Sequence, residues 1–262
     1  MPVTIVDNPA HPRCGGHQWF IDDLDALASL MAIVMVGRAR RVGSILDGAE
    51  HGPVTILPTT KARLQRELVL ADGVHTWHRD GLLFETMCWI VARMGAGPDE
   101  VLSDPHRRAT QQGADTVKVV FDPARRELVG VTVYEQKCSD DARGKFRDEV
   151  LPAFKNWFVG VRDDELMQIA IGLLDRYNLT DMEHEKAYAD IILKRPLSFR
   201  AALTVSPQVF PAAECVKLFK DYEELELEVA ARFGDTFPLD DIRGWFKAFA
   251  AVVWSKIEQF NV

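Results

Sequence analysis

Two acids and a lysine near the middle of the chain, Asp115, Glu135 and Lys137, have the types and spacing that metal-assisted hydrolysis requires. Two carboxylates held side by side repel each other unless a cation lies between them, and oxygen ligands with room for water suit Mg²⁺, with Mn²⁺ as an alternative. Such an ion lowers the pKa of a bound water, and a neighbouring lysine can orient that water or stabilise a phosphoryl oxygen. The three residues therefore predict a metal site for phosphodiester hydrolysis.

A β-hairpin must bring these residues together. The stretches 115–121 and 128–137 are rich in β-branched residues and a turn sequence separates them, so two antiparallel strands are predicted. Folding about that turn pairs residues whose numbers sum to roughly 250, and this register places Asp115 across from Glu135. Directly paired Cβ atoms lie about 4.5–5.5 Å apart, close enough for both acids to bind one ion.

The alternation of side chains along the strands supports this pairing, because each strand directs apolar residues and then its acid to one face. The apolar positions on that face are Val117, Val119, Phe121, Val129, Val131 and Val133. Asp122, the other acid of the first strand, would lie near Glu127 at the far end of the hairpin, so we exclude it as a ligand. A Glu-x-Lys pair at a strand end is more often a simple ion pair, and the acid in register is what favours chemistry here.

The rest of the chain is predicted to be mainly helical. Apolar residues recur at helical spacing through 22–41, 60–70, 81–94, 145–158, 163–177, 181–193, 212–234 and 239–260. Residues 198–205 predict a further strand, 54–57 a short one, and the first dozen residues an extended arm or edge strand. The helix over 81–94 carries a lone acid, Glu85, which becomes a further candidate metal ligand if its side chain points toward the hairpin.

Two groups of basic residues lie close to the acids in the sequence. His106, Arg107 and Arg108 precede Asp115 on a loop where a phosphate could pass, but we interpret them as a solvated charged run. Arg143, Lys145 and Arg147 follow Lys137 and could flank a substrate backbone, positioning it without reading its bases.

The order of these features resembles the PD-(D/E)xK phosphodiesterases, whose fold is that of the restriction endonucleases. The matching features are a helix with Glu85, then Gly113-Ala114-Asp115, then Tyr134-Glu135-Gln136-Lys137, then another helix. The resemblance implies that Glu85, Asp115 and Glu135 bind Mg²⁺ and that Lys137 assists the attacking water. It also implies an α/β fold, with a central mixed sheet flanked by helices. Ala114 stands where the family's motif usually has proline.

More narrowly, the chain is similar to the nuclease subunits of bacterial anti-phage systems, above all the HamA nucleases of Hachiman, in length, motif order and helical tail. That resemblance implies a DNA substrate and a helicase partner that delivers DNA and holds the nuclease silent until infection. A net charge of −8 would then be understandable, because Lys and Arg otherwise supply most nonspecific affinity for nucleic acid. An RNA or tRNA nuclease and a catalytically silent binding module of the same fold remain alternatives.

Length and composition set the remaining expectations. With 262 residues, of which 47% are hydrophobic and 27% charged, the chain can bury a sizeable core. The four cysteines are too dispersed for a zinc site, and the longest N-terminal apolar run, about 13 residues, is too short to cross a membrane. We expect a cytoplasmic α/β protein, with a mainly helical N-terminal elaboration over 1–78 and the nuclease core with C-terminal helices over 79–262.

Overall fold

The computed structural model describes residues 1–7, 13–71, 76–108, 113–207 and 212–262, which form an α/β protein around one mixed sheet. Its strands are β1 (Val3–Asp7), β2 (His17–Ile21), β3 (Glu100–Leu102), β4 (Thr116–Asp122), β5 (Glu127–Lys137), β6 (Leu197–Val205) and β7 (Arg232–Pro238). Their order across the sheet is β1-β2-β7-β6-β5-β4-β3. The pairs β2–β7, β7–β6 and β6–β5 are parallel, whereas β1–β2, β5–β4 and β4–β3 are antiparallel.

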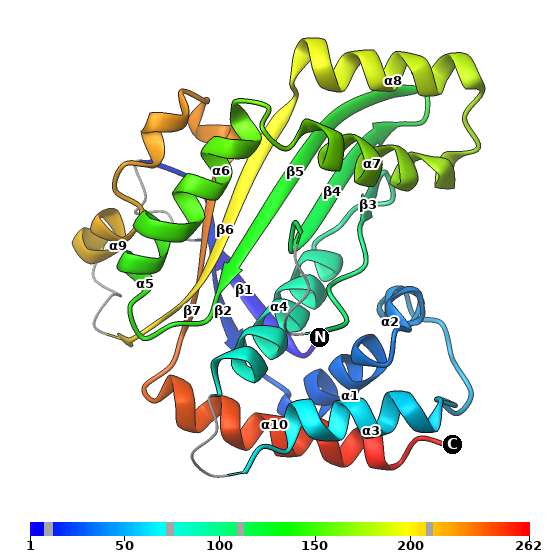
Figure 1. Ribbon diagram of the computed structural model, residues 1–262, viewed down its shortest axis with the longest axis vertical. Coiled ribbons are helices and arrows are strands. Elements are labelled where there is room, and N and C mark those ends of the chain that lie inside the picture. The colour runs from blue at the N-terminus through cyan, green and yellow to red at the C-terminus, as the bar shows by residue number, and fades with distance from the viewer. Residues whose placement is uncertain (8–12, 72–75, 109–112, 208–211) are drawn as a thin grey trace.

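Helices cover both faces of this sheet (Figure 1). One hydrophobic core contains residues of α1 (Leu24–Met35), α2 (Ala39–Leu46), α3 (Pro58–Leu68), α4 (Trp77–Met94) and α10 (Ile242–Glu258). The other contains residues of α5 (Ala142–Lys145), the π-helical turn Phe146–Val150, α6 (Leu151–Phe158), α7 (Asp163–Leu174), α8 (Asp181–Lys194) and α9 (Ala212–Leu218). The sheet is therefore buried between two helical layers, and α4 is the helix that packs closest to β5 on the first side.

The predicted hairpin is confirmed. Thr116 pairs with Tyr134, and the same register continues to Val120 opposite Gly130. A β-bulge then shifts the pairing, so that Phe121 lies opposite Leu128 and Val129 has no partner across the strand. The expectation that Val129 shares the buried apolar face is wrong, because the extra residue of a bulge is turned outward and this side chain is 56% exposed.

The C-terminal third differs from its predicted pattern. The helix expected over 212–234 is wrong: α9 ends at Leu218, two 3-10 turns follow, and β7 joins the sheet. Glycine lets β7 pass close to its neighbours, since a Cβ at Gly234 would lie 2.5 Å from Phe219 Cζ. Its other unusual residue, Asp235, is buried in an ion pair with Arg200 of the adjacent β6, so β7 does not have the alternating pattern of an ordinary strand.

The N-terminal segment supplies the edge of the sheet as well as helices. Beyond the expected arm, β1 pairs with β2, and β2 continues the sheet beside β7. The strand expected over 54–57 is reduced to one bridge between Thr55 and Asn261. Cys14 and Cys88 are buried and Cys138 is partly buried, whereas the side chain of Cys215 lies outside the described residues. Among the described helices, none has the length and apolar character that a membrane span needs.

Candidate metal centre

The open end of the β4–β5 hairpin holds the predicted acids. Asp115 directly precedes β4, and its Oδ2 accepts a hydrogen bond from the backbone N–H of Gln136 at 2.6 Å. Continuing the observed register by one residue beyond Thr116 brings Asp115 opposite Glu135, as the sequence predicts. The backbone of one strand thus orients the carboxylate of the other, and its second oxygen, Oδ1, faces the loop that follows β3.

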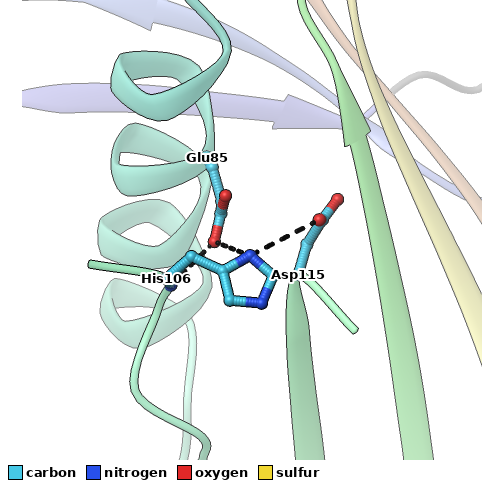
Figure 2. Close-up of side chains that lie close together, drawn as sticks. All are labelled: Glu85, His106 and Asp115. Atoms are coloured by element: carbon cyan, nitrogen blue, oxygen red, sulfur yellow. Dashed lines mark hydrogen bonds and ion pairs between the residues drawn. The ribbon is translucent and has the colours of Figure 1, made fainter. Parts of the chain in front are cut away.

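His106 on that loop joins Asp115 to helix α4 (Figure 2). Its backbone N–H donates to Glu85 Oε1 at 2.8 Å, and its Nδ1 lies 3.1 Å from the same oxygen. The Nδ1 atom also lies 4.0 Å from Asp115 Oδ1. One ligand atom from each of Glu85, His106 and Asp115 falls within 4.8 Å of the others, so these three residues form a compact set that could hold one metal ion.

The structure corrects the interpretation of His106 as part of a solvated run. Its side chain is only 9% exposed, whereas Arg107 and Arg108 are exposed as expected. The loop that carries His106 is fixed at Ser103, whose carbonyl accepts from Trp89 Nε1 of α4 and whose Oγ accepts from the Val117 N–H of β4. No sequence signal separates this histidine from the two arginines beside it, because the contacts that bury it come from distant elements.

The turn that enters β4 places Gly113 in a backbone conformation that favours glycine. Its φ is +135°, and a Cβ there would lie 3.2 Å from Glu165 Oε1 and 3.5 Å from His106 Nε2. That same Glu165 oxygen accepts the backbone N–H of Ala114 at 3.0 Å, and Arg162 donates to the Glu165 carboxylate. The alanine at the position where the family motif usually has proline therefore supplies an N–H that a proline would lack.

Glu135 and Lys137 lie beside this set on β5. Glu135 is buried, and its Oε2 lies 3.4 Å from Lys137 Nζ. Burial lowers the pKa of Lys137, but the Asp115 and Glu135 carboxylates outweigh it, so the pKa is raised above its ordinary value. Lys137 is therefore an ammonium cation at neutral pH and is suited to stabilising negative charge, not to accepting a proton. Glu135 is not one of the three residues whose ligand atoms converge, and its direct role as a metal ligand remains a prediction.

The electrostatics of the cluster favour a bound cation. Burial, then the nearby Glu135 and Glu85 carboxylates, raise the pKa of Asp115 well above its usual range, and burial likewise raises the pKa of Glu135. The hydrogen bond to Glu85 is the main cause of a raised pKa at His106. Three acids compete for positive charge in one small region, so a divalent ion bound there would be strongly stabilised.

The sequence predicts a site with oxygen ligands only, whereas the structure brings together two carboxylates and an imidazole. This mixed set suits a divalent transition metal better than Mg²⁺. Carboxylate oxygens suit Mg²⁺ and Mn²⁺, whereas an imidazole nitrogen is typical of transition-metal sites. Glu85 and Asp115 supply the former and His106 the latter. All three side chains are partly accessible, between 9% and 16% exposed, so an ion and a substrate oxygen could both reach them.

The second predicted basic group has other partners. Arg143 donates to the carbonyls of Leu218 and Lys220 and to Asp221. Lys145 pairs with Glu149, and Arg147 pairs with Asp148. Their charges are largely compensated locally, which weakens the expectation that they flank a substrate backbone.

Comparisons of this chain with protein-family models, with curated proteins and with solved structures find no match. Its function is therefore inferred from the side chains of this site.

Proposed function

We propose that this chain is a metal-dependent nuclease with a restriction-endonuclease-like core, which hydrolyses phosphodiester bonds in DNA. The observation that carries the proposal is the convergence of Glu85, His106 and Asp115 beside the Glu135–Lys137 pair, at the open end of a hairpin. Acidic and imidazole ligands next to a partly buried lysine cation suit metal-assisted hydrolysis of a phosphodiester bond.

Each side chain has a distinct part in this proposal. A divalent ion held by Glu85, His106 and Asp115 would lower the pKa of a water molecule and polarise the scissile phosphate. Lys137, protonated beside Glu135, stabilises the negative charge that grows on the phosphoryl oxygens. Glu135 holds the ammonium group of Lys137 in place. The Gln136 N–H fixes the orientation of Asp115 before any substrate arrives.

The rival is a catalytically silent subunit of the same fold that only binds a partner. Burial and the carboxylates of Glu135 and Glu85 raise the pKa of Asp115 at an energetic cost, and a silent subunit has no chemical reason to keep these acids together. An RNA nuclease would use the same machinery, so the substrate is decided by experiment. That the chain acts with a helicase in anti-phage defence is proposed from the resemblance in length, motif order and helical tail and from the acidic net charge.

The test is cleavage of plasmid DNA, linear single-stranded DNA and total RNA by the wild type and by Lys137→Ala. Each reaction contains Mg²⁺, Mn²⁺ or EDTA, with and without a helicase encoded beside the gene. Cutting that needs metal and is lost in Lys137→Ala supports the nuclease and identifies its substrate. Absence of cutting in every reaction would favour the silent binding module, and cutting unaffected by the helicase would count against the defence complex.

A further inference from the structure

A concentration of arginines lies next to the metal centre, on a chain whose net charge is −8. Two surface hollows contain it. The first, about 670 Å³, is lined by Arg38, Arg40, Arg41, His51 and Arg107 among others, and the second, about 410 Å³, by Arg63, Arg66 and Arg108. We call these seven arginines together the arginine groove. They come from α2 and the residue before it, from α3 and from the loop after β3, so the fold gathers them from three separate segments of the sequence.

The charges of the groove are mostly uncompensated. Arg38, Arg40, Arg66 and Arg108 are exposed, and none of their side chains has a hydrogen bond or ion pair with another described residue. Arg41 donates to the backbone carbonyls of Gly52 and Pro53, which leaves its charge unneutralised.

Acids in the two hollows are few. The acid lining the first hollow is Asp104, which lies 3.9 Å from Arg107. The acid lining the second is Glu67, which pairs with Arg63. Seven guanidinium groups against two carboxylates leave a strongly positive local surface, which attracts polyanions.

One loop carries both residues of the arginine groove and a residue of the proposed metal centre. Arg107 and Arg108 directly follow His106, whose ring lies between Glu85 and Asp115. Arg63 donates to the carbonyl oxygen of Arg107 at 2.6 Å, which ties α3 to this loop. A phosphate chain held by the arginines would therefore pass beside the metal ligands.

The residues lining the groove indicate what kind of polyanion it takes. Grooves that hold single strands combine positive charge with aromatic side chains on which bases stack. Apart from His51, the described residues lining the two hollows include no aromatic side chain. Guanidinium groups instead form bidentate hydrogen bonds with phosphate oxygens and carry no sequence information.

We infer that the arginine groove binds the sugar-phosphate backbone of a nucleic-acid duplex and leads it to the metal centre. Cleavage of the bound duplex rests on the proposed nuclease function. Binding of the duplex to the arginine groove does not depend on cleavage and can be measured separately. The arginine groove also gives the acidic chain a nucleic-acid surface of its own.

The experiment measures binding of a fluorescent 20-base-pair DNA duplex by anisotropy in EDTA, over a series of salt concentrations. The triple variant Arg38→Gln/Arg40→Gln/Arg108→Gln removes two charges from the first hollow and one from the second. The matched control, Arg125→Gln/Lys194→Gln/Lys217→Gln, removes three exposed charges from the β4–β5 turn, α8 and α9. Thermal melting verifies that both variants remain folded, and single-stranded DNA and duplex RNA serve as competitors.

The groove variant should bind at least about tenfold more weakly than wild type in low salt, and its salt dependence should flatten by about 0.9 in slope for each arginine that meets a phosphate. The control variant should bind as the wild type does. Equal binding by wild type and groove variant, or no duplex binding by wild type, would overturn the inference. Stronger competition by single strands than by duplex would refute the duplex assignment.

Cleavage assays on the same proteins separate this inference from the proposed function. Arginine-dependent binding without metal-dependent cutting would keep the groove and reject the nuclease. Metal-dependent cutting with binding unchanged in the groove variant would keep the nuclease and reject the groove.

Discussion

Replacing Gly113 with alanine tests whether the turn into β4 fixes the metal centre. At φ +135° an L-residue is strained, and the new Cβ would lie 3.2 Å from Glu165 Oε1 and 3.5 Å from His106 Nε2. Backbone strain of this kind costs about 1–3 kcal/mol, and each kcal/mol lowers the Tm of a chain of this size by about 2–4 °C. Gly113→Ala should therefore melt several degrees below wild type. It should also bind Mn²⁺ more weakly, because the strained turn and the tight contact with Glu165 Oε1 shift the backbone that leads into Asp115.

Gly172→Ala is the matched control. Gly172 lies in α7 without a positive φ, and a Cβ added there would meet nothing within 4 Å, so alanine should stabilise the helix by about 0.5–1 kcal/mol. Both variants are melted by circular dichroism with and without Mn²⁺. Equal Tm values for Gly113→Ala and wild type, with equal response to Mn²⁺, would refute the idea that this glycine shapes the site.

Three further changes probe the site and the sheet. Mn²⁺ at a hundred times its Kd should stabilise wild type by about 2.7 kcal/mol. In a melting assay, Glu85→Gln should lose most of this stabilisation. An Mn²⁺-induced Tm shift equal to that of wild type would show that Glu85 is not a metal ligand. Ala114→Pro deletes the N–H that Glu165 accepts and should cost about 1.5–3 kcal/mol in urea unfolding, so a neutral result would contradict the assigned hydrogen bond. Asp235 is 2% exposed and pairs with Arg200, so Asp235→Asn should destabilise the fold by about 3–5 kcal/mol; a loss below about 1 kcal/mol would contradict the buried pair.

The Asp235 pair also predicts a pH dependence. Burial alone would raise the pKa of Asp235, but Arg200 and His17 outweigh it and lower the pKa below its usual value. A lowered folded pKa means that the stabilisation is complete above the unfolded value near about pH 4 and is lost as pH falls through the folded value. Wild type should therefore lose more stability on acidification than Asp235→Asn does, and parallel acid-unfolding curves would contradict this assignment.

The sequence predicts those strands and helices whose local residue pattern agrees with the way they pack in the fold. The β-branched stretches and the turn between them predict the β4–β5 hairpin. The predicted position of Asp115 opposite Glu135 is met only because the β-bulge shifts the pairing by one residue between the turn and the open end. Helix α4 and the strand β6 follow from apolar periodicity in the same way. These elements position the candidate site, so its hairpin and its helix were both predictable.

Contacts between distant elements were not predictable from local pattern. His106 is buried because Glu85, 21 residues away, and the anchored Ser103 hold it, and nothing in the sequence around it distinguishes it from a solvated residue. Strand β7 was not predictable because two of its residues suit contacts with other elements. Gly234 leaves room for the ring of Phe219, and Asp235 forms an ion pair with Arg200. The arginine groove likewise exists only after α2, α3 and the loop after β3 have come together.

Plasmid nicking in Mn²⁺ by Asp115→Asn tests most directly whether Asp115 belongs to a metal-dependent catalytic centre. Asp122→Asn is the matched control, since Asp122 lies at the other end of the same strand and accepts turn N–H groups from Ala124 and Arg125. We predict that wild type and Asp122→Asn nick the plasmid in Mn²⁺ and not in EDTA, and that Asp115→Asn does not nick it. Nicking by Asp115→Asn at the wild-type rate, or no nicking by the wild type, would contradict the proposed function.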